Sequence, residues 1–175
     1  MVGVGSSLRG DDAAGLRVAT RLSAWAARTG TDRLAAFAGG AAPENLTGEI
    51  SRYRPDCVVL VDAAHLGRAP GEVALVAPER VGGLACSTHR LPLPILLDYL
   101  RATTGCRTVV VGIQLGHEDV LAPLTPAVAR GVRRLVAALQ RAASAPAAAR
   151  RPPGPAAGPM ADPAGPPPCS ARGNG

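Results

Sequence analysis

Short apolar runs alternate with segments of helical periodicity along the first part of the chain. Residues 58–61, 73–76 and 108–113 are continuous runs rich in β-branched side chains, and residues 34–38 form a weaker run. Continuous β-branched runs of this length are typical of strands that are covered on both faces of a sheet. The pattern therefore predicts strands at these four places.

Helical segments lie between and after these runs. A helix is expected from residue 11 or 12 to about 28, and another over 93–102, after two prolines. Thr125 followed by Pro126 is a capping residue with proline at the first helical position, so a closing helix should begin there. Its apolar stripe consists of Val128, Val132, Leu135 and Leu139.

This alternation predicts an α/β fold with three layers, helices on both sides of a twisted, mostly parallel sheet of about five strands. In such folds the active site lies outside the carboxyl ends of the strands. The predicted domain covers residues 1–143. Residues 144–175 are rich in Pro, Ala and Gly and carry almost no large apolar residue, so we expect a disordered tail.

The net charge of +6 raises the question of nucleic-acid binding. All 19 basic residues are arginines, and they are scattered along the chain rather than clustered. A nucleic-acid interface gathers its charge on one face, and single-stranded nucleic acid is bound on aromatic side chains, which make up only 2% of this chain. We therefore expect solvated surface charge and no nucleic-acid partner.

Cysteine usage and hydropathy bear on the cellular compartment. The four cysteines contain no Cys-x-x-Cys pair, which excludes the common zinc and thioredoxin-like spacings. No secretory signal is visible at the start, and no window approaches the roughly 18 apolar residues of a membrane-spanning helix. We expect a cytoplasmic protein with reduced thiols and no membrane insertion.

Three polar residues stand where predicted strands lead into loops. Asp12 follows a glycine turn, Asp62 follows the apolar run at 58–61, and His89 precedes a helix that begins with proline. Each has an ordinary structural interpretation as well: Asp12 as a helix cap, Asp62 as a turn residue and His89 as a surface histidine. At the carboxyl edge of a parallel sheet, however, all three would converge.

Two carboxylates and one imidazole are fewer ligands than a closed structural metal site needs. Such a set suits a metal that brings its other ligands with it. The glycine turn at 3–10 begins like a dinucleotide-binding loop, but Leu8 stands in place of the third glycine and two acids follow. A Gly-x-Ser-x-Gly nucleophile elbow is also missing there. Nucleotide binding is therefore the weaker hypothesis.

Taken together, these segments resemble the maturation endopeptidases of nickel–iron hydrogenases, particularly the type that serves hydrogenase 3 of formate hydrogenlyase. The resemblance covers nearly all of residues 2–140 and rests on an ordered set of motifs. They are GVG at 3–5, GDDAAG at 10–15, GGAAPEN at 39–45, VDAA at 61–64, PGE at 70–72, STHRLPL at 87–93, GIQ at 112–114 and PLTP at 123–126.

The resemblance implies an endopeptidase that removes a C-terminal extension from the precursor of the hydrogenase large subunit after nickel insertion. The nickel is carried by the substrate, and Asp12, Asp62 and His89 would bind it transiently. The bond could be cut by metal assistance or with a carboxylate as general base. Glu44 and Asn45 are candidate substrate contacts, and equally candidate helix-start residues. We expect the protein to be a monomer.

The chain departs from the family pattern in three places. Ser6 stands where the family usually has Asn, and Leu115 stands where a proline often follows Gly-Ile-Gln. Before the glycine turn only Met1 and Val2 remain of a first strand that normally has several apolar residues. We therefore expect the true start to lie upstream, or the chain to be a truncated and poorly stable form. A non-catalytic nickel-sensing chaperone of the same fold is the alternative hypothesis.

Overall fold

The computed structural model describes residues 1–77 and 92–145 of the chain. These residues form a five-stranded sheet with the order β2-β1-β3-β5-β4. The strands are β1 (Val2–Val4), β2 (Phe37–Gly40), β3 (Cys57–Ala64), β4 (Val73–Val76) and β5 (Arg107–Gln114). All neighbours pair in parallel except β4, which runs antiparallel to β5 at the edge. The predicted mostly parallel sheet is confirmed.

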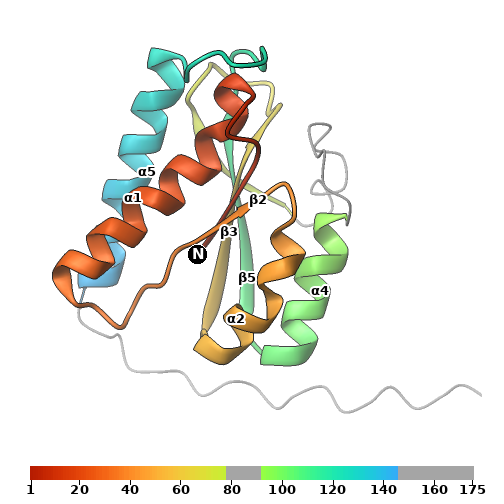
Figure 1. Cartoon of the computed structure of the whole chain (residues 1–175), viewed down its shortest axis with the longest axis vertical. Coiled ribbons are helices and arrows are strands. Elements are labelled where there is room, and N and C mark those ends of the chain that lie inside the picture. The colour runs from red at the N-terminus through yellow and green to blue at the C-terminus, as the bar shows by residue number, and fades with distance from the viewer. Residues whose placement is uncertain (78–91, 146–175) are drawn as a thin grey trace, which may run out of the picture.

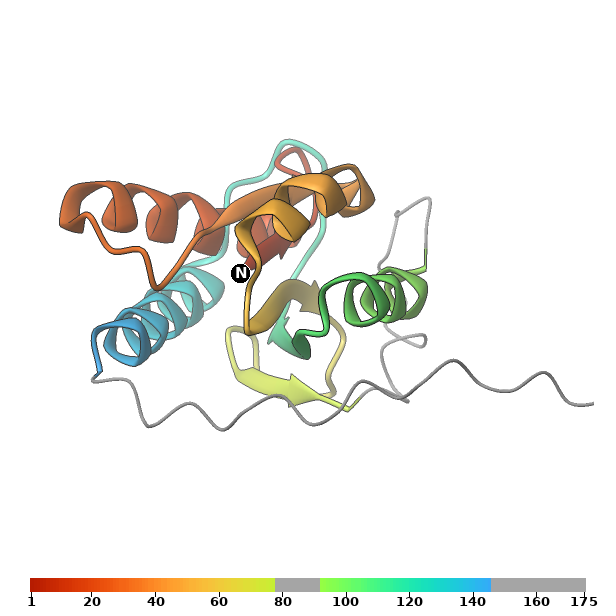
Figure 2. The same ribbon diagram turned by 90° about the horizontal axis from the view of Figure 1, so that it is seen from below.

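Helices cover both faces of the sheet, as predicted (Figures 1 and 2). The α-helices are α1 (Ala14–Thr29), α2 (Thr47–Tyr53), α4 (Leu93–Thr104) and α5 (Pro126–Ser144), and two 3-10 turns are η1 (Gly10–Ala13) and η2 (Pro43–Leu46). α1 and α5 lie together on one face, and α2 and α4 lie on the other. No helix of the described residues is both long and apolar enough to cross a bilayer.

Alternation along β3 divides the core between the two faces. Val58 and Leu60 pack with the leucines of α4, whereas Val61 and Ala63 pack with Val18 and its neighbours on α1 and α5. Both faces of β3 are therefore buried, and this explains why its sequence is an almost uninterrupted apolar run.

The helices and strands differ from the sequence predictions mainly at their ends. The weak run at 34–38 becomes a strand three residues further on, at Phe37–Gly40, and the helix expected from residue 11 or 12 starts at Ala14 after the turn η1. No range was predicted for the short helix α2, although Glu44 and Asn45, which were named as candidate helix-start residues, lie in the turn η2 that leads into it. Thr125 caps α5 as expected, and its side chain accepts a hydrogen bond from the N–H of Val128. The predicted tail, 144–175, lies almost wholly outside the described residues and stays a prediction.

The first strand is short, as the sequence suggested. β1 has three residues beside the eight of β3, and of the residues of β3 it pairs with Leu60 and Val61 alone. Beside the start of β1 lies a partly open cavity of about 230 Å³, whose lining includes Met1, Phe37 and Val58. The amino end of the sheet is thus incompletely filled. An upstream start remains a prediction.

Candidate active site

The candidate site lies at the carboxyl ends of β1 and β3, where the loops after β1, β3 and β5 come together at the upper end of the molecule in Figure 1. The loop after β1 pairs through its backbone with the loop after β5. Asp11 donates its N–H to the carbonyl of His117 at 3.1 Å, and Leu121 donates its N–H to the carbonyl of Leu8 at 2.7 Å. Residues distant in sequence therefore share one rim.

Asp12 is held in η1 with its side chain almost fully buried. The N–H of Ser6 donates to Asp12 Oδ2 at 2.8 Å, and Asp12 donates its own N–H to the carbonyl of Arg9 at 2.9 Å. Burial raises the pKa of the Asp12 carboxyl, and the Ser6 N–H partly offsets this rise. The negative charges of Asp62 and Glu118 raise the pKa of Asp12 further, whereas Arg9 lowers it.

Asp62 lies inside β3 rather than just after it, because the strand continues for two residues to Ala64. It stands opposite Gly112 of β5 and is 3% exposed, as is Asp12. Since the charge of Asp62 contributes to the raised pKa of Asp12, the two carboxyl groups are near enough to repel each other. The structure therefore brings together two of the three predicted site residues.

Of the other three candidate residues, the structure describes Glu44 and Asn45 but not His89. His89 lies outside the described residues, so its position beside the two acids stays a prediction. Glu44 and Asn45 lie in η2, shortly after β2. The N–H of Gly5 donates to the carbonyl of Gly40 at 3.1 Å, and this hydrogen bond joins the end of β2 to the glycine turn after β1. Oε2 of Glu44 is buried and has no hydrogen-bond partner among the described residues, whereas Asn45 is exposed.

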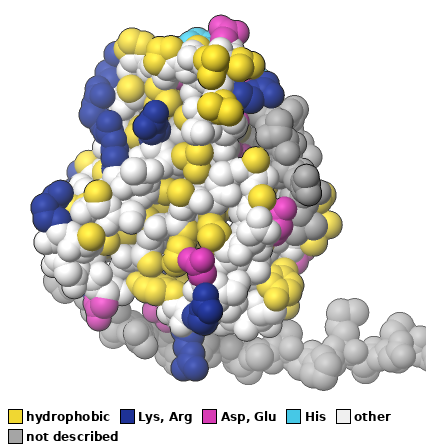
Figure 3. Space-filling model, in the orientation of Figure 1, with side chains coloured by type: hydrophobic (Ala, Val, Ile, Leu, Met, Phe, Trp, Pro, Cys, Tyr) yellow, Lys and Arg dark blue, Asp and Glu magenta, His cyan; other side chains and the backbone are white. Residues whose placement is uncertain are grey.

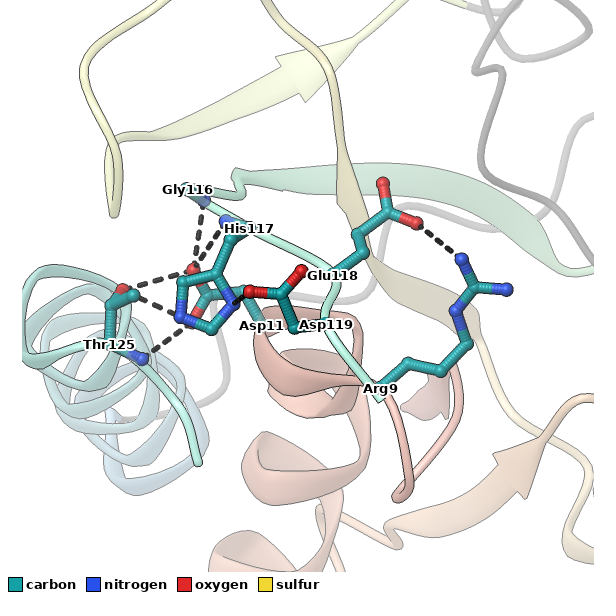
Figure 4. A network of polar contacts seen from close by, with 7 residues as sticks. All are labelled: Arg9, Asp11, Gly116, His117, Glu118, Asp119 and Thr125. Atoms are coloured by element: carbon teal, nitrogen blue, oxygen red, sulfur yellow. Dashed lines mark hydrogen bonds and ion pairs between the residues drawn. The ribbon is translucent and has the colours of Figure 1, made fainter. Parts of the chain in front are cut away.

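Asp11, the neighbour of Asp12, is the centre of a dense hydrogen-bond network (Figure 4). Its carboxylate is fully buried and accepts from the N–H groups of Gly116 at 2.8 Å, His117 at 3.2 Å and Thr125 at 2.7 Å. The hydroxyl of Thr125 donates to it as well, at 3.0 Å. Asp11 therefore joins η1, the loop after β5 and the start of α5, and this explains why two acids stand side by side.

Gln114, at the end of β5, has a comparable role for the loop that follows Asp62. Its side-chain oxygen accepts from the N–H of Leu66 at 2.6 Å and of Arg68 at 3.2 Å. Its side-chain nitrogen donates to the carbonyl of Leu115 at 2.8 Å. Because both the oxygen and the nitrogen of this buried amide are hydrogen-bonded, the loop after β3 is fixed relative to β5.

A charged cluster that sequence reasoning missed borders the two acids. Arg9 Nη2 lies 3.2 Å from one oxygen of Glu118, and His65 Nε2 lies 3.4 Å from the other. Figure 4 shows Arg9 reaching from the loop after β1 toward Glu118 in the loop after β5. These contacts join three loops, and no local motif in the sequence signals them.

The described residues contain no complete metal site. Among them, no group of three His, Cys, Asp or Glu side chains could hold a metal ion. Asp12 and Asp62 can supply oxygen ligands, which suit a borderline or hard cation, but further ligands must come from elsewhere. Fold and site thus define an α/β protein with two buried acids at the carboxyl edge of its sheet.

Comparison with known proteins gives the family. Residues 16–142 match the family model of the hydrogenase maturation protease HycI. The chain is 32% identical over 123 residues to the hydrogenase 3 maturation protease of Escherichia coli (strain K12), a match that covers 70% of this chain and 76% of the relative. The chain belongs to the hydrogenase maturation protease family, as the motifs predicted.

Solved structures of the family share the fold. The maturation protease HycI of Thermococcus kodakarensis KOD1 superposes with a TM-score of 0.68 at 32% identity, over 80% of this chain and 88% of that one. The endopeptidase HycI of Escherichia coli superposes with a TM-score of 0.69 at 30% identity, over 80% and 87%. The three-layer fold is thus that of known maturation endopeptidases.

Proposed function

We propose that this chain is an endopeptidase that removes the C-terminal extension from the precursor of a nickel–iron hydrogenase large subunit. It acts as a cytoplasmic monomer and recognises the nickel that the precursor carries, through Asp12, Asp62 and His89. The observation that carries this proposal is the pair of buried carboxyl groups, Asp12 in η1 and Asp62 in β3, which lie near each other at one edge of the sheet, so that the charge of Asp62 raises the pKa of Asp12.

The repulsion between these two carboxyl groups gives a physical reason for selecting a nickel-loaded precursor. Two buried carboxylates close together destabilise each other and lose hydration. A divalent cation placed between Asp12 and Asp62 reverses both effects, because it attracts both charges and replaces the lost water. A precursor without nickel offers no such compensation. The site therefore favours the loaded precursor by differential binding rather than by shape alone.

The bound nickel can serve the reaction in either of two ways. It can polarise the carbonyl of the bond to be cut or lower the pKa of a water molecule. Alternatively it positions the chain while a carboxylate acts as general base, a role favoured by a pKa raised toward the working pH. The raised pKa of Asp12 fits the second route, and the paired oxygen ligands fit the first.

Glu44 and Asn45 are proposed to contact the precursor chain beside the nickel. A buried carboxylate oxygen without a hydrogen-bond partner among the described residues, as on Glu44, costs free energy in the unbound protein. A backbone N–H or a polar side chain of the precursor would remove that cost on binding. Asn45 is exposed next to it and can both donate and accept.

The proposal is tested by incubating the protein with nickel-loaded and nickel-free precursor and measuring the product mass. The wild type should shorten only the loaded precursor. Asp12→Asn, Asp62→Asn and His89→Ala should keep their fold, seen by circular dichroism, and lose at least about 100-fold in rate, as expected when an electrostatic contact to the reacting centre is removed.

Asp98→Asn is the matched control, because this acid is exposed on α4 and, among the residues that the structure describes, its ion pair is with Arg101 of the same helix. It should cleave at the wild-type rate. Normal cleavage by Asp62→Asn would disprove the ligand assignment. Binding of loaded precursor without any shortened product would favour the non-catalytic nickel-sensing chaperone instead.

A further inference from the structure

Three large aliphatic side chains stand in solvent at the rim of the candidate site. Leu8 is 59% exposed, Val120 is 72% exposed and Leu121 is 78% exposed. Leu8 belongs to the loop after β1, and the other two belong to the loop after β5. Single exposed aliphatic residues are ordinary, but a group of them beside a functional site marks a binding surface. We refer to these three residues as the apolar rim.

The apolar rim is built on a rigid joint between its two loops. Arg9 and Val120 form an antiparallel bridge, and the N–H of Leu121 donates to the carbonyl of Leu8 at 2.7 Å. The carboxylate of Asp11 also joins these two loops, through the N–H groups of Gly116 and His117 (Figure 4). A surface that is already ordered loses little conformational entropy when it binds. The rim is therefore preorganised.

Leu121 occupies a backbone conformation that does not suit it. Its φ is 61°, in the left-handed region, where a branched aliphatic residue is strained and Gly or Asn is relaxed. The side chain contributes little packing energy to the fold, since most of it is in solvent. Strain of this kind gathers at binding and active sites. The position holds an apolar side chain outward at a cost to stability.

The apolar rim is continuous with the candidate acids. Asp12 donates its N–H to the carbonyl of Arg9, the residue next to Leu8, and Asp12 accepts from Ser6 on the other side of Leu8. Of the charged residues in the two loops, Arg9 pairs with Glu118, whereas the carboxylate of Asp119, next to Val120, is exposed and lies 3.8 Å from His117 Nδ1. The three aliphatic side chains themselves offer an apolar surface beside the site.

We propose that the apolar rim binds an apolar segment of the precursor next to the peptide bond that is cut. This inference rests on the proposed function. The acids recognise the nickel, which fixes one point of the precursor. The rim fixes a second point on the flexible chain beside it, so that the bond to be cut is held in one orientation. Figure 3 shows hydrophobic side chains gathered at this upper end of the molecule.

The test replaces the apolar rim without harming the backbone. Leu121→Asn accepts the left-handed conformation and removes the aliphatic group, and Val120→Thr keeps the shape of valine. The double variant should raise KM for nickel-loaded precursor about tenfold, the size expected for losing roughly one buried aliphatic side chain, with kcat within about twofold of the wild type. Its Tm should stay at or above the wild-type value, because the strain at residue 121 is relieved.

Leu75→Thr is the matched control, since Leu75 is 77% exposed on β4, away from the rim, and threonine suits a strand. It should leave KM and kcat unchanged. Affinity for the loaded precursor, measured by biolayer interferometry, separates the two proposals. If the wild type binds without cutting, the peptidase proposal fails, and the apolar rim is still judged by the affinity of its double variant.

Two outcomes would overturn the apolar rim itself. One is an unchanged KM, or an unchanged affinity, in the double variant. The other is a concentration-dependent dimer of the wild type in analytical ultracentrifugation that the double variant abolishes, which would make the rim an interface between two copies of this chain. A wild type that neither binds nor cuts the loaded precursor would overturn both proposals together.

Discussion

The two ends of the sheet are stabilised in different ways. At the carboxyl end, two buried polar side chains, Asp11 and Gln114, fix the loops next to the candidate acids through hydrogen bonds of 2.6–3.2 Å. At the amino end, β1 is only three residues long and a cavity of about 230 Å³ remains beside Met1. One end is defined by directional bonds, the other by apolar packing.

The difference shows what each end must do. A site that reads a metal needs its ligands held within a fraction of an ångström, and only satisfied hydrogen bonds give buried loops that precision. The amino end has no ligands to place, so it needs only enough apolar contact to close the sheet. Substitutions that remove a hydrogen bond at the carboxyl end should therefore lower the free energy of unfolding strongly. Changes at the amino end should lower it little, and filling the cavity there should raise it.

The largest effect is expected from the neighbouring pair Asp11 and Asp12. Asp11→Ala leaves three backbone N–H groups and the Thr125 hydroxyl without their acceptor, and should cost about 3–5 kcal/mol of unfolding free energy. Asp12→Ala loses one N–H partner, that of Ser6, but also removes a buried charge. It should change stability by less than about 1 kcal/mol.

Urea unfolding followed by circular dichroism measures both variants. The slope of free energy against urea should stay constant, so that the midpoint alone reports stability. Asp11→Asn, which keeps one carbonyl oxygen, should lie between the wild type and Asp11→Ala. Equal losses for Asp11→Ala and Asp12→Ala would contradict the division of labour between the two acids.

Local patterns were enough to predict the fold and to select two acids. The β-branched runs gave β3, β4 and β5, and proline after Thr125 gave the start of α5. Asp12 and Asp62 stood out because each adjoins a strand end in the sequence, and parallel strands bring such ends to one edge. The hydrophobic pattern therefore predicts the architecture, and the position of each acid beside a strand end predicts where the candidate site lies.

The partners of the buried polar groups could not be predicted. Asp11 bonds to Gly116 and Thr125, more than a hundred residues away, and Glu118 meets Arg9 across a similar separation. No short stretch of sequence contains both partners of such a pair. The sequence therefore indicated only that Asp11 and Asp12 have different roles, and not which residues Asp11 contacts. The same reasoning missed α2, because its seven residues are too few to show a helical period.

The second prediction fills the amino end. Four residues, Met-Thr-Val-Ile, placed ahead of Met1 would continue β1 alongside Val58 and Cys57, which pair only with β5 among the described residues. Burying one or two aliphatic side chains in the cavity should stabilise the protein by about 2 kcal/mol. Differential scanning calorimetry should show a higher Tm. Met-Gly-Ser-Gly at the same place should not raise it, and an equal gain from both would refute cavity filling.

The smallest expected effect concerns the amino group of Met1. This ammonium donates to the carbonyl of Ala35 at 2.6 Å, and burial lowers its pKa from 8.0 to about 6. Between pH 8 and pH 6 the unfolded chain therefore binds a proton that the folded protein does not. Stability should be fully present above pH 8 and should fall as the pH drops toward 6.

Two pKa units correspond to about 2.7 kcal/mol, and the water that still reaches the ammonium reduces this to an expected loss of about 1 kcal/mol. Urea midpoints measured at pH 8, 7 and 6 would show the decline. The same chain acetylated at Met1 is the control, because its amide keeps the hydrogen bond to Ala35 and carries no charge. Its stability should decline less over this range by that same amount, which isolates the contribution of the ammonium. If the stability of both chains declines equally, burial does not lower the pKa of the Met1 ammonium as expected. The difference between the two ends of the sheet would then depend only on the hydrogen bonds of Asp11 and Gln114.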